Sequence, residues 1–281
     1  MDKIIQSKYR LEVFRKMEEL EKEGVFDVDL ENDPPFNPIK EGEVDFLRKK
    51  LSSKIKSKIA DKVSFNYFNK LIKKGQIVID GYEGIENLIS FDKGAIITAN
   101  HFHPFDSIAL HKVFKKYKKK HHLYKIIREG NYSFPGLFGF FMRNCYSLPL
   151  SDNFKVMKEC MASIDTLLQN GEYILVYAEQ SLWWNYRKPK PLKEGAFRFA
   201  IKNNVPVLPT FITMRDTDRL DNEGFYIQAY TLHILKPIYP DPNLSLKENI
   251  KMMKNKNEQM WKEVYEKVYG VPLTYLTKEK E

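Results

Sequence analysis

Strand-like and helix-like segments alternate along the chain from residue 76 onward, and this alternation restricts the fold more than any other feature. Short apolar runs predict strands over 76–81, 94–99, 123–127, 145–150, 172–178, 205–213 and 225–235. Apolar residues at helical spacing predict helices over 107–118, 154–169, 192–203 and, last, 246–268. Because strands that alternate with helices usually pair in parallel, we expect an α/β fold. Its mostly parallel central sheet, flanked by helices, would belong to one domain over residues 76–281.

The first 75 residues predict an N-terminal helical extension, a basic amphipathic arm. An amphipathic helix is expected over 1–24, followed by an acidic, turn-rich segment over 27–42. A second helix is expected over 43–74. Its apolar residues recur at every fourth position, and many lysines lie between them; the apolar residues are Leu47, Leu51, Ile55, Ile59, Val63 and Tyr67. Such a stripe most often packs against the rest of a protein. It also suits an anionic bilayer, where the lysines meet lipid phosphates.

The net charge of +9 predicts an anionic partner, such as a phosphate-bearing molecule or a membrane surface. Nucleic acid is not expected, because the basic residues are not interleaved with exposed aromatic residues as in known nucleic-acid modules. Cys145 and Cys160 have neither metal-binding nor redox spacing, which favours a reducing compartment. No signal peptide is recognised, and every apolar run is shorter than the roughly 18–20 residues of a spanning helix. These features predict a cytoplasmic protein, soluble or peripheral on the inner face of the membrane.

One short segment carries candidate chemistry at the end of a predicted strand. The apolar run that begins at Ile96 ends at Asn100, His101 follows at once, and Asp106 stands five residues later, just before a predicted helix. A histidine at a strand-to-helix junction can move a proton, and a carboxylate one turn on can orient its ring and stabilise its cation. The alternative is structural, with Asp106 or Ser107 capping the helix and His101 as a loop residue.

Three later segments complete an ordered set. The first covers residues 138–152, the second is the strand 174–178 that delivers Glu179 and Ser181 at its end, and the third covers 192–209. In open α/β sheets, ligands collect at the carboxyl ends of the strands. We therefore expect His101, Glu179 and Ser181 to converge there.

In this order, the segments resemble the glycerolipid acyltransferase family, whose members acylate glycerol 3-phosphate, 1-acylglycerol 3-phosphate and related lysolipids. The N-H-x-x-x-x-D segment that contains His101 and Asp106 is similar to the family's first motif, and 178–181 (A-E-Q-S) falls where the family has P-E-G-T-R-S. The segment from Lys193 to Pro209 is similar to its next helix and its fourth motif. The resemblance covers residues 76–235.

The resemblance implies roles for these residues. His101 would be the general base that takes a proton from the acceptor hydroxyl, and Asp106 would orient it, with no covalent intermediate, no metal and no cofactor. The co-substrates would be an acyl thioester, either acyl-CoA or acyl carrier protein, and a glycerolipid or lysolipid acceptor at an anionic membrane surface. The expected substrate-binding residues are Asn100, Arg128, Arg143, Glu179, Ser181, Arg187 and Lys193.

The departures from the family pattern concern the acceptor. Asp152 and Leu182 stand where family members have arginines tied to the acceptor's phosphate, and Gln180 stands in place of a glycine. We therefore expect an acceptor other than glycerol 3-phosphate; a lysolipid with its phosphate held elsewhere, a glycolipid or another alcohol fits. A non-catalytic basic protein that binds anionic lipid surfaces is the alternative. The aromatic segment 134–142 is expected in the core, with an acyl channel as a second interpretation.

Overall fold

The computed structural model describes residues 6–31, 35–90 and 94–277. In these residues the strands form one seven-stranded sheet in the order β1-β7-β6-β2-β5-β3-β4. The strands are β1 (Val78–Glu83), β2 (Ala95–Thr98), β3 (Leu123–Arg128), β4 (Ser147–Leu150), β5 (Tyr173–Val176), β6 (Val207–Leu220) and β7 (Tyr226–Ile234). Neighbouring strands are parallel except β6 and β7, which form an antiparallel pair. The predicted α/β fold with a mostly parallel sheet is confirmed.

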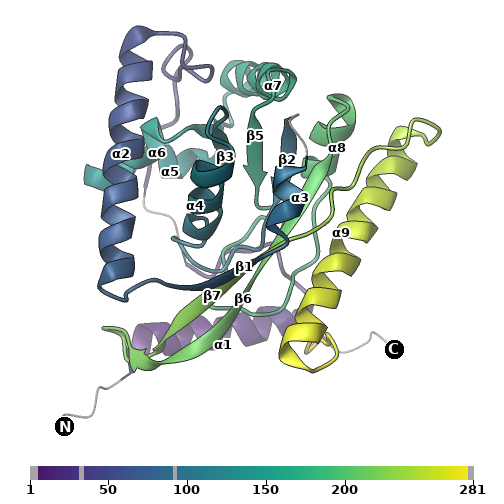
Figure 1. Cartoon of the computed structure of the whole chain (residues 1–281). Helices are drawn as coiled ribbons and strands as arrows, with labels where there is room; N and C mark the ends of the chain where they lie inside the picture. Colours follow the sequence, from purple (N-terminus) through teal and green to yellow (C-terminus); the bar gives the residue numbers. More distant parts are fainter. Residues whose placement is uncertain (1–5, 32–34, 91–93, 278–281) are drawn as a thin grey trace.

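Helices cover both faces of this sheet (Figure 1). One face carries α7 (Phe154–Gln169), α8 (Gly195–Lys202) and α9 (Leu246–Tyr269). The other carries α3 (Ile85–Ile89), α4 (Ile108–Tyr117) and the end of α2 (Leu51–Lys73). Two short helices, α5 (Glu129–Tyr132) and α6 (Gly136–Asn144), lie between β3 and β4 in the chain. Because separate groups of helices cover the two faces, each face of the sheet has its own hydrophobic core.

The central strands β2 and β5 determine where the polar loops meet. Every residue of β2 is buried, as expected for a parallel strand that is covered on both faces. The register pairs Thr98 with Val176, so the residues that follow the two strands leave the sheet at the same edge. His101 and Glu179 come shortly after these paired residues, which brings their loops together.

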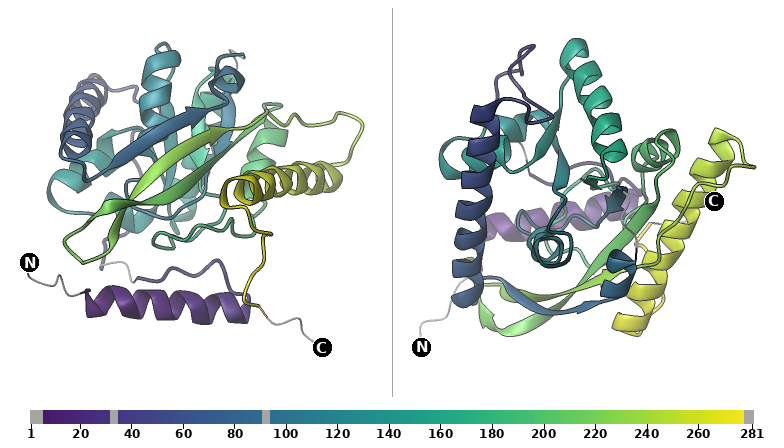
Figure 2. Two further views of the ribbon diagram at one scale, coloured as in Figure 1. Left: turned by 60° about the horizontal axis from the view of Figure 1, so that its bottom comes forward. Right: turned by 45° about the horizontal axis from the view of Figure 1, so that its top comes forward.

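The N-terminal helix α1 (Lys8–Glu23) lies across this carboxyl edge of the sheet, separate from the helices on the two faces (Figures 1 and 2). The Ser7 side chain caps its first turn, and Gly24 ends it in the left-handed conformation. On the helix, Phe14 packs against Trp184 with ring centroids 5.3 Å apart. The helix expected over 1–24 is thus confirmed from Lys8 to Glu23; residues 1–5, like Asp33 and Pro34 of the acidic segment, lie outside the described residues.

Helix α2 differs from expectation at its start and in the face that it buries. It begins at Leu51 rather than near residue 43, because the Asp45 carboxylate accepts the backbone N–H groups of the two lysines before Leu51 and forms a turn there. The buried residues of α2 are the small ones Ser57 and Ala60, whereas four of the predicted stripe residues are exposed, namely Leu51 (73%), Ile55 (50%), Ile59 (50%) and Val63 (39%). The expectation that this stripe packs against the domain is wrong for these four residues.

No helix within the described ranges is both long and apolar enough to cross a membrane.

Candidate active site

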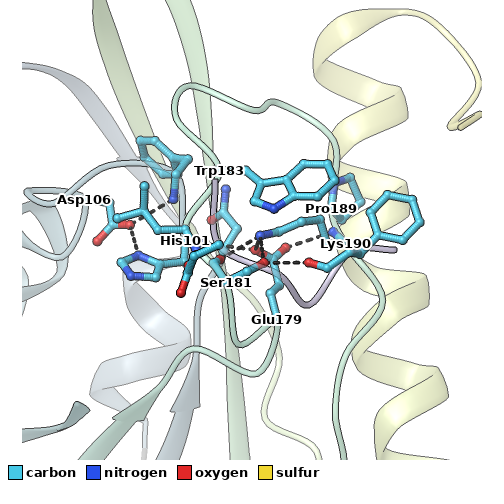
Figure 3. A network of polar contacts seen from close by, with 12 residues as sticks. His101, Asp106, Glu179, Ser181, Trp183, Pro189 and Lys190 are labelled. Atoms are coloured by element: carbon cyan, nitrogen blue, oxygen red, sulfur yellow. Dashed lines mark hydrogen bonds and ion pairs between the residues drawn. The ribbon is translucent and has the colours of Figure 1, made fainter. Parts of the chain in front are cut away.

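His101 and Asp106 form a hydrogen-bonded pair in the loop between β2 and α4 (Figure 3). His101 Nδ1 lies 2.7 Å from Asp106 Oδ2; the His101 side chain is 23% exposed, and that of Asp106 is 1% exposed. The same carboxylate oxygen accepts the backbone N–H groups of Phe102, at 3.1 Å, and His103, at 3.4 Å. The loop thus holds the carboxylate rigidly and leaves one edge of the imidazole open to solvent.

Tyr177, directly after β5, contacts both members of this pair. Its hydroxyl donates a hydrogen bond to Asp106 Oδ1 at 2.5 Å, and its ring stacks on the His101 imidazole with centroids 3.8 Å and planes 15° apart. Burial raises the pKa of Tyr177 well above its ordinary value, so the phenol keeps its proton as a donor. The sequence interpretation missed Tyr177, which stands two residues before Glu179 at the end of an apolar strand and has no sequence feature that sets it apart from a core tyrosine.

The surroundings keep Asp106 ionised. Burial alone would raise the pKa of its carboxyl, but the imidazole of His101 and the hydroxyl of Tyr177 favour the charged form and hold the pKa below its ordinary value. A carboxylate at Nδ1 orients the imidazole with its proton on Nδ1, which leaves Nε2 with a lone pair. His101 Nε2 forms no hydrogen bond with any described residue. The geometry suits a general base that accepts a proton at Nε2 and whose cation is stabilised at Nδ1.

Glu179, Ser181 and Lys190 form a buried network behind the pair (Figure 3). Glu179 accepts the backbone N–H of His101 at 3.0 Å with one oxygen and that of Lys190 at 2.8 Å with the other. The Lys190 ammonium donates to the Ser181 hydroxyl at 2.7 Å and lies 3.5 Å from Glu179. Burial raises the pKa of Glu179 and lowers that of Lys190. The structure thus places the predicted residues Glu179 and Ser181 inside the protein, where Glu179 holds the loop that contains His101 and Ser181 bonds Lys190 and the Phe26 carbonyl.

Two further predicted residues bond to the backbone. Asn100 is buried, and its side-chain amide forms two hydrogen bonds with the main chain of Ile212, at 3.0 and 2.8 Å. The Arg143 guanidinium donates to the carbonyl oxygens of Tyr132, at 2.9 Å, and Phe134, at 3.0 Å. In this arrangement both side chains fix the loops near the site.

The remaining predicted cations are each paired with a carboxylate. Arg128 pairs with Asp29 at 2.5 Å, and Lys193 pairs with Asp27 at 2.6 Å. Both aspartates belong to the segment after α1. The third, Arg187, lies 2.7 Å from Asp216 of β6. Spacing in the sequence gave no sign of these partners, because each of the first two ion pairs joins residues about 100 or more positions apart.

A cavity of about 620 Å³ begins at the loop that contains the pair and runs between α2, α4 and α6. Pro104, Phe105 and Ser107 of that loop line one part of it. Its walls combine phenylalanine side chains with several lysines, and the phenylalanines include Phe65, Phe68, Phe114, Phe134, Phe138 and Phe141. His111 also lines it, and burial lowers the pKa of this imidazole to about 4, so it is neutral at pH 7. The cavity has the size and apolar character of a site for a lipid chain.

Within the described residues, no three His, Cys, Asp or Glu side chains lie together in a way that could hold a metal ion.

Comparisons with known proteins bear on the family and on the fold. Residues 76–213 match the family model described as Acyltransferase. No curated protein matches the chain. Among solved structures, the chain is similar to the crystal structure of the 1-acyl-sn-glycerophosphate (LPA) acyltransferase, PlsC, from Thermotoga maritima. The two are 22% identical with a TM-score of 0.50, and the match covers 79% of this chain and 81% of that one. This likeness supports the shared fold.

Proposed function

We propose that the chain moves a fatty acyl group from a thioester to a hydroxyl of a glycerolipid or lysolipid, because residues 76–213 match the acyltransferase family model and the sequence motifs point the same way. The observation that carries the proposal is that the loop of the His101–Asp106 pair also lines one part of an apolar cavity of about 620 Å³. One feature supplies a base for the acceptor, and the other a place for the acyl chain.

The reaction needs one proton to move. His101 Nε2 takes the proton of the acceptor hydroxyl as its oxygen attacks the thioester carbonyl and forms a tetrahedral adduct. The adduct then collapses, the C–S bond breaks, and the departing sulfur takes the proton back from the imidazolium. Asp106 stabilises the imidazolium between these steps. Since the thioester is already activated, positioning of the two substrates supplies much of the remaining rate enhancement.

The cavity would bind the acyl chain. Each methylene group that it removes from water contributes about 0.8 kcal/mol, so the aromatic walls favour long chains. The donor is acyl-CoA or acyl carrier protein, because both present the same thioester. The acceptor is a lysolipid, a glycolipid or another lipid alcohol rather than glycerol 3-phosphate.

The exposed face of α2 supports work at a membrane surface. Leu51, Ile55, Ile59 and Val63 project outward among the lysines of this helix, a combination in which apolar side chains enter the headgroup boundary and ammonium groups meet anionic lipids. The same helix contributes Phe65 and Phe68 to the cavity wall. A lipid chain leaving the bilayer beside α2 would therefore have a short path to the cavity.

The test is release of free thiol. The purified protein is mixed with lipid vesicles, a pool of lipid alcohols and either palmitoyl-CoA or palmitoyl carrier protein, and the acylated product is identified by mass spectrometry. We expect thiol and product in equal amounts with the wild type, and a rate at least about 100-fold lower with His101→Ala. Vesicle binding without thiol release in either sample would instead favour the non-catalytic, lipid-binding alternative.

A further inference from the structure

The loop that follows β5 is tied to the catalytic loop by its main chain. The backbone N–H of Trp183 donates to the carbonyl of His101 at 3.2 Å, and that of Asn185 donates to the carbonyl of Phe102 at 2.9 Å. Leu182 immediately precedes this connection, so its backbone N–H lies close to the His101–Asp106 pair. A group bound to the Leu182 amide is therefore held on a segment that is hydrogen-bonded to the loop of the candidate base.

That amide already binds an anion, and the anion belongs to the protein. One carboxylate oxygen of Asp29 accepts the Leu182 N–H at 2.7 Å, while the other lies 2.5 Å from the Arg128 guanidinium. A backbone amide together with a guanidinium is a donor set that binds phosphate as readily as carboxylate. Asp29 thus occupies an anion site on the segment that is tied to the loop of the candidate base.

The segment that carries Asp29 is anchored firmly. Phe26 stacks on Trp183 with ring centroids 5.5 Å apart and accepts the Ser181 hydroxyl at its carbonyl oxygen, at 2.6 Å. The Trp183 indole N–H donates to the carbonyl of Val28 at 2.8 Å. Phe26 and Leu30, on either side of Asp29, are buried in the cluster that also contains Trp183. These contacts fix the backbone on both sides of Asp29, so its carboxylate is held within reach of the Leu182 amide and the Arg128 guanidinium.

We propose that Asp29 makes the site reject acceptors with a phosphomonoester headgroup and select lipid alcohols that are uncharged at this position. This inference rests on the proposed function and adds the class of acceptor to it. A phosphomonoester carries between one and two negative charges at neutral pH. Next to Asp29, the phosphomonoester would meet the Arg128 guanidinium, whose charge Asp29 already neutralises, and the negative charge of Asp29 itself. This arrangement weakens binding of the phosphomonoester several-fold to many-fold. An uncharged hydroxyl headgroup meets no such repulsion.

Asp29→Asn tests the inference with little change in shape, because the asparagine carbonyl can still accept the Leu182 N–H. The matched control is Glu31→Gln, which removes a carboxylate from the same segment, where it bonds Tyr9 and Arg10 instead. Thiol release is measured with palmitoyl-CoA and two acceptors that differ only in phosphate, a monoacylglycerol and the matching 1-acylglycerol 3-phosphate. We expect the wild type and Glu31→Gln to prefer the monoacylglycerol, and Asp29→Asn to lower that preference by at least about tenfold through faster use of the phosphate acceptor.

A binding measurement keeps the inference separate from the proposed function. Titration with sn-glycerol 3-phosphate in a calorimeter needs no turnover, and we expect Asp29→Asn to bind it at least about tenfold more tightly than the wild type and the control. Tighter binding without thiol release from any sample would refute the proposed function and leave the inference standing. Equal binding by all three proteins, or a wild type that prefers the phosphate acceptor, would overturn the inference.

Discussion

Replacing Asp106 by asparagine separates the two roles of this carboxylate, orientation and charge. Asp106 Oδ2 accepts from three donors, the His101 ring nitrogen and two backbone N–H groups, whereas Oδ1 accepts from the Tyr177 hydroxyl, which can rotate. In Asp106→Asn, an amide nitrogen in the place of Oδ2 would face three donors. The asparagine carbonyl oxygen must therefore occupy the Oδ2 position. The imidazole therefore keeps its orientation and tautomer, and only the negative charge is lost.

The cost follows from that geometry. A hydrogen bond to a charged group is stronger than a neutral one by about 1 kcal/mol, which gives a lower limit. An ion pair with charges about 4 Å apart at an effective dielectric constant of about 20 gives an upper limit near 4 kcal/mol. We expect Asp106→Asn to lose about 2–3 kcal/mol of transition-state stabilisation, or roughly 30- to 150-fold in kcat. His101→Ala, which removes the base itself, should cost up to about 10⁴-fold.

The assay is initial-rate thiol release under saturating palmitoyl-CoA, with circular dichroism to show that both variants are folded. An Asp106→Asn rate within about threefold of the wild type would show that the charge does no catalytic work. A loss equal to that of His101→Ala would show that the pair acts as one unit, and either result would refute the separation of orientation from charge.

The same variant has a predicted effect on acid stability. The pKa of Asp106 in the folded protein lies below its ordinary value of 3.8, so the charged group stabilises the fold above that pH. This stabilisation is lost as the pH falls through the lower, folded-state pKa. In urea titrations between about pH 4 and pH 2, we expect the free energy of unfolding to fall less steeply in Asp106→Asn than in the wild type. Identical slopes would contradict the direction of the shift.

Three further predictions concern stability, chain length and membrane binding. Lys190→Met leaves a buried carboxylate unpaired and should lower the free energy of unfolding by about 3–5 kcal/mol; Lys202→Met, which breaks an exposed pair, should cost under about 1 kcal/mol in the same urea titration. Met142→Trp narrows the cavity and should slow transfer from long acyl-CoA chains while short chains react as before; an unchanged chain-length profile would place the acyl chain elsewhere. Ile55→Ser should weaken sedimentation with anionic vesicles, whereas Ile89→Ser, equally exposed on α3, should not; equal losses would exclude α2 as the binding face.

Most of the fold could be predicted because hydrophobic periodicity reports burial against the sheet. All seven predicted strands are present within a few residues of their expected ends, except that β6 continues from the predicted end at 213 to Leu220, and the predicted helices α4, α7, α8 and α9 are present as well. The helices α3, α5 and α6 were missed: α3 and α5 have only five and four residues, too few to establish a helical period, and the aromatic residues of α6 were interpreted as a core segment without a helix. For α2, periodicity pointed to the wrong face, because close packing of this helix uses small residues such as Ser57 and Ala60 and leaves the isoleucines outside.

The part of the candidate site that could be predicted consists of residues close together in the sequence, because short spacing alone brings their side chains into contact. The five-residue spacing brought His101 and Asp106 together as expected; their catalytic roles remain predictions. Tyr177 was missed because a tyrosine in an apolar strand also suits a core position, and only its contact with Asp106 distinguishes it. The partner of Arg128 was not predictable, since Asp29 lies 99 positions earlier in the chain and a surface cation has many available carboxylates.

The stacking of Tyr177 on His101 bears on which hydroxyl of a polyol would react. The lone pair of Nε2 lies in the plane of the imidazole, and the phenol ring covers one side of that plane almost in parallel. An alcohol must therefore approach Nε2 close to the plane of the imidazole ring in order to transfer its proton. On a glycerol backbone, neighbouring hydroxyls point in different directions. Only one of them can approach Nε2 in the imidazole plane while the lipid tail stays in place. The regiochemistry of the product would then be decided by the tilt of a single aromatic ring.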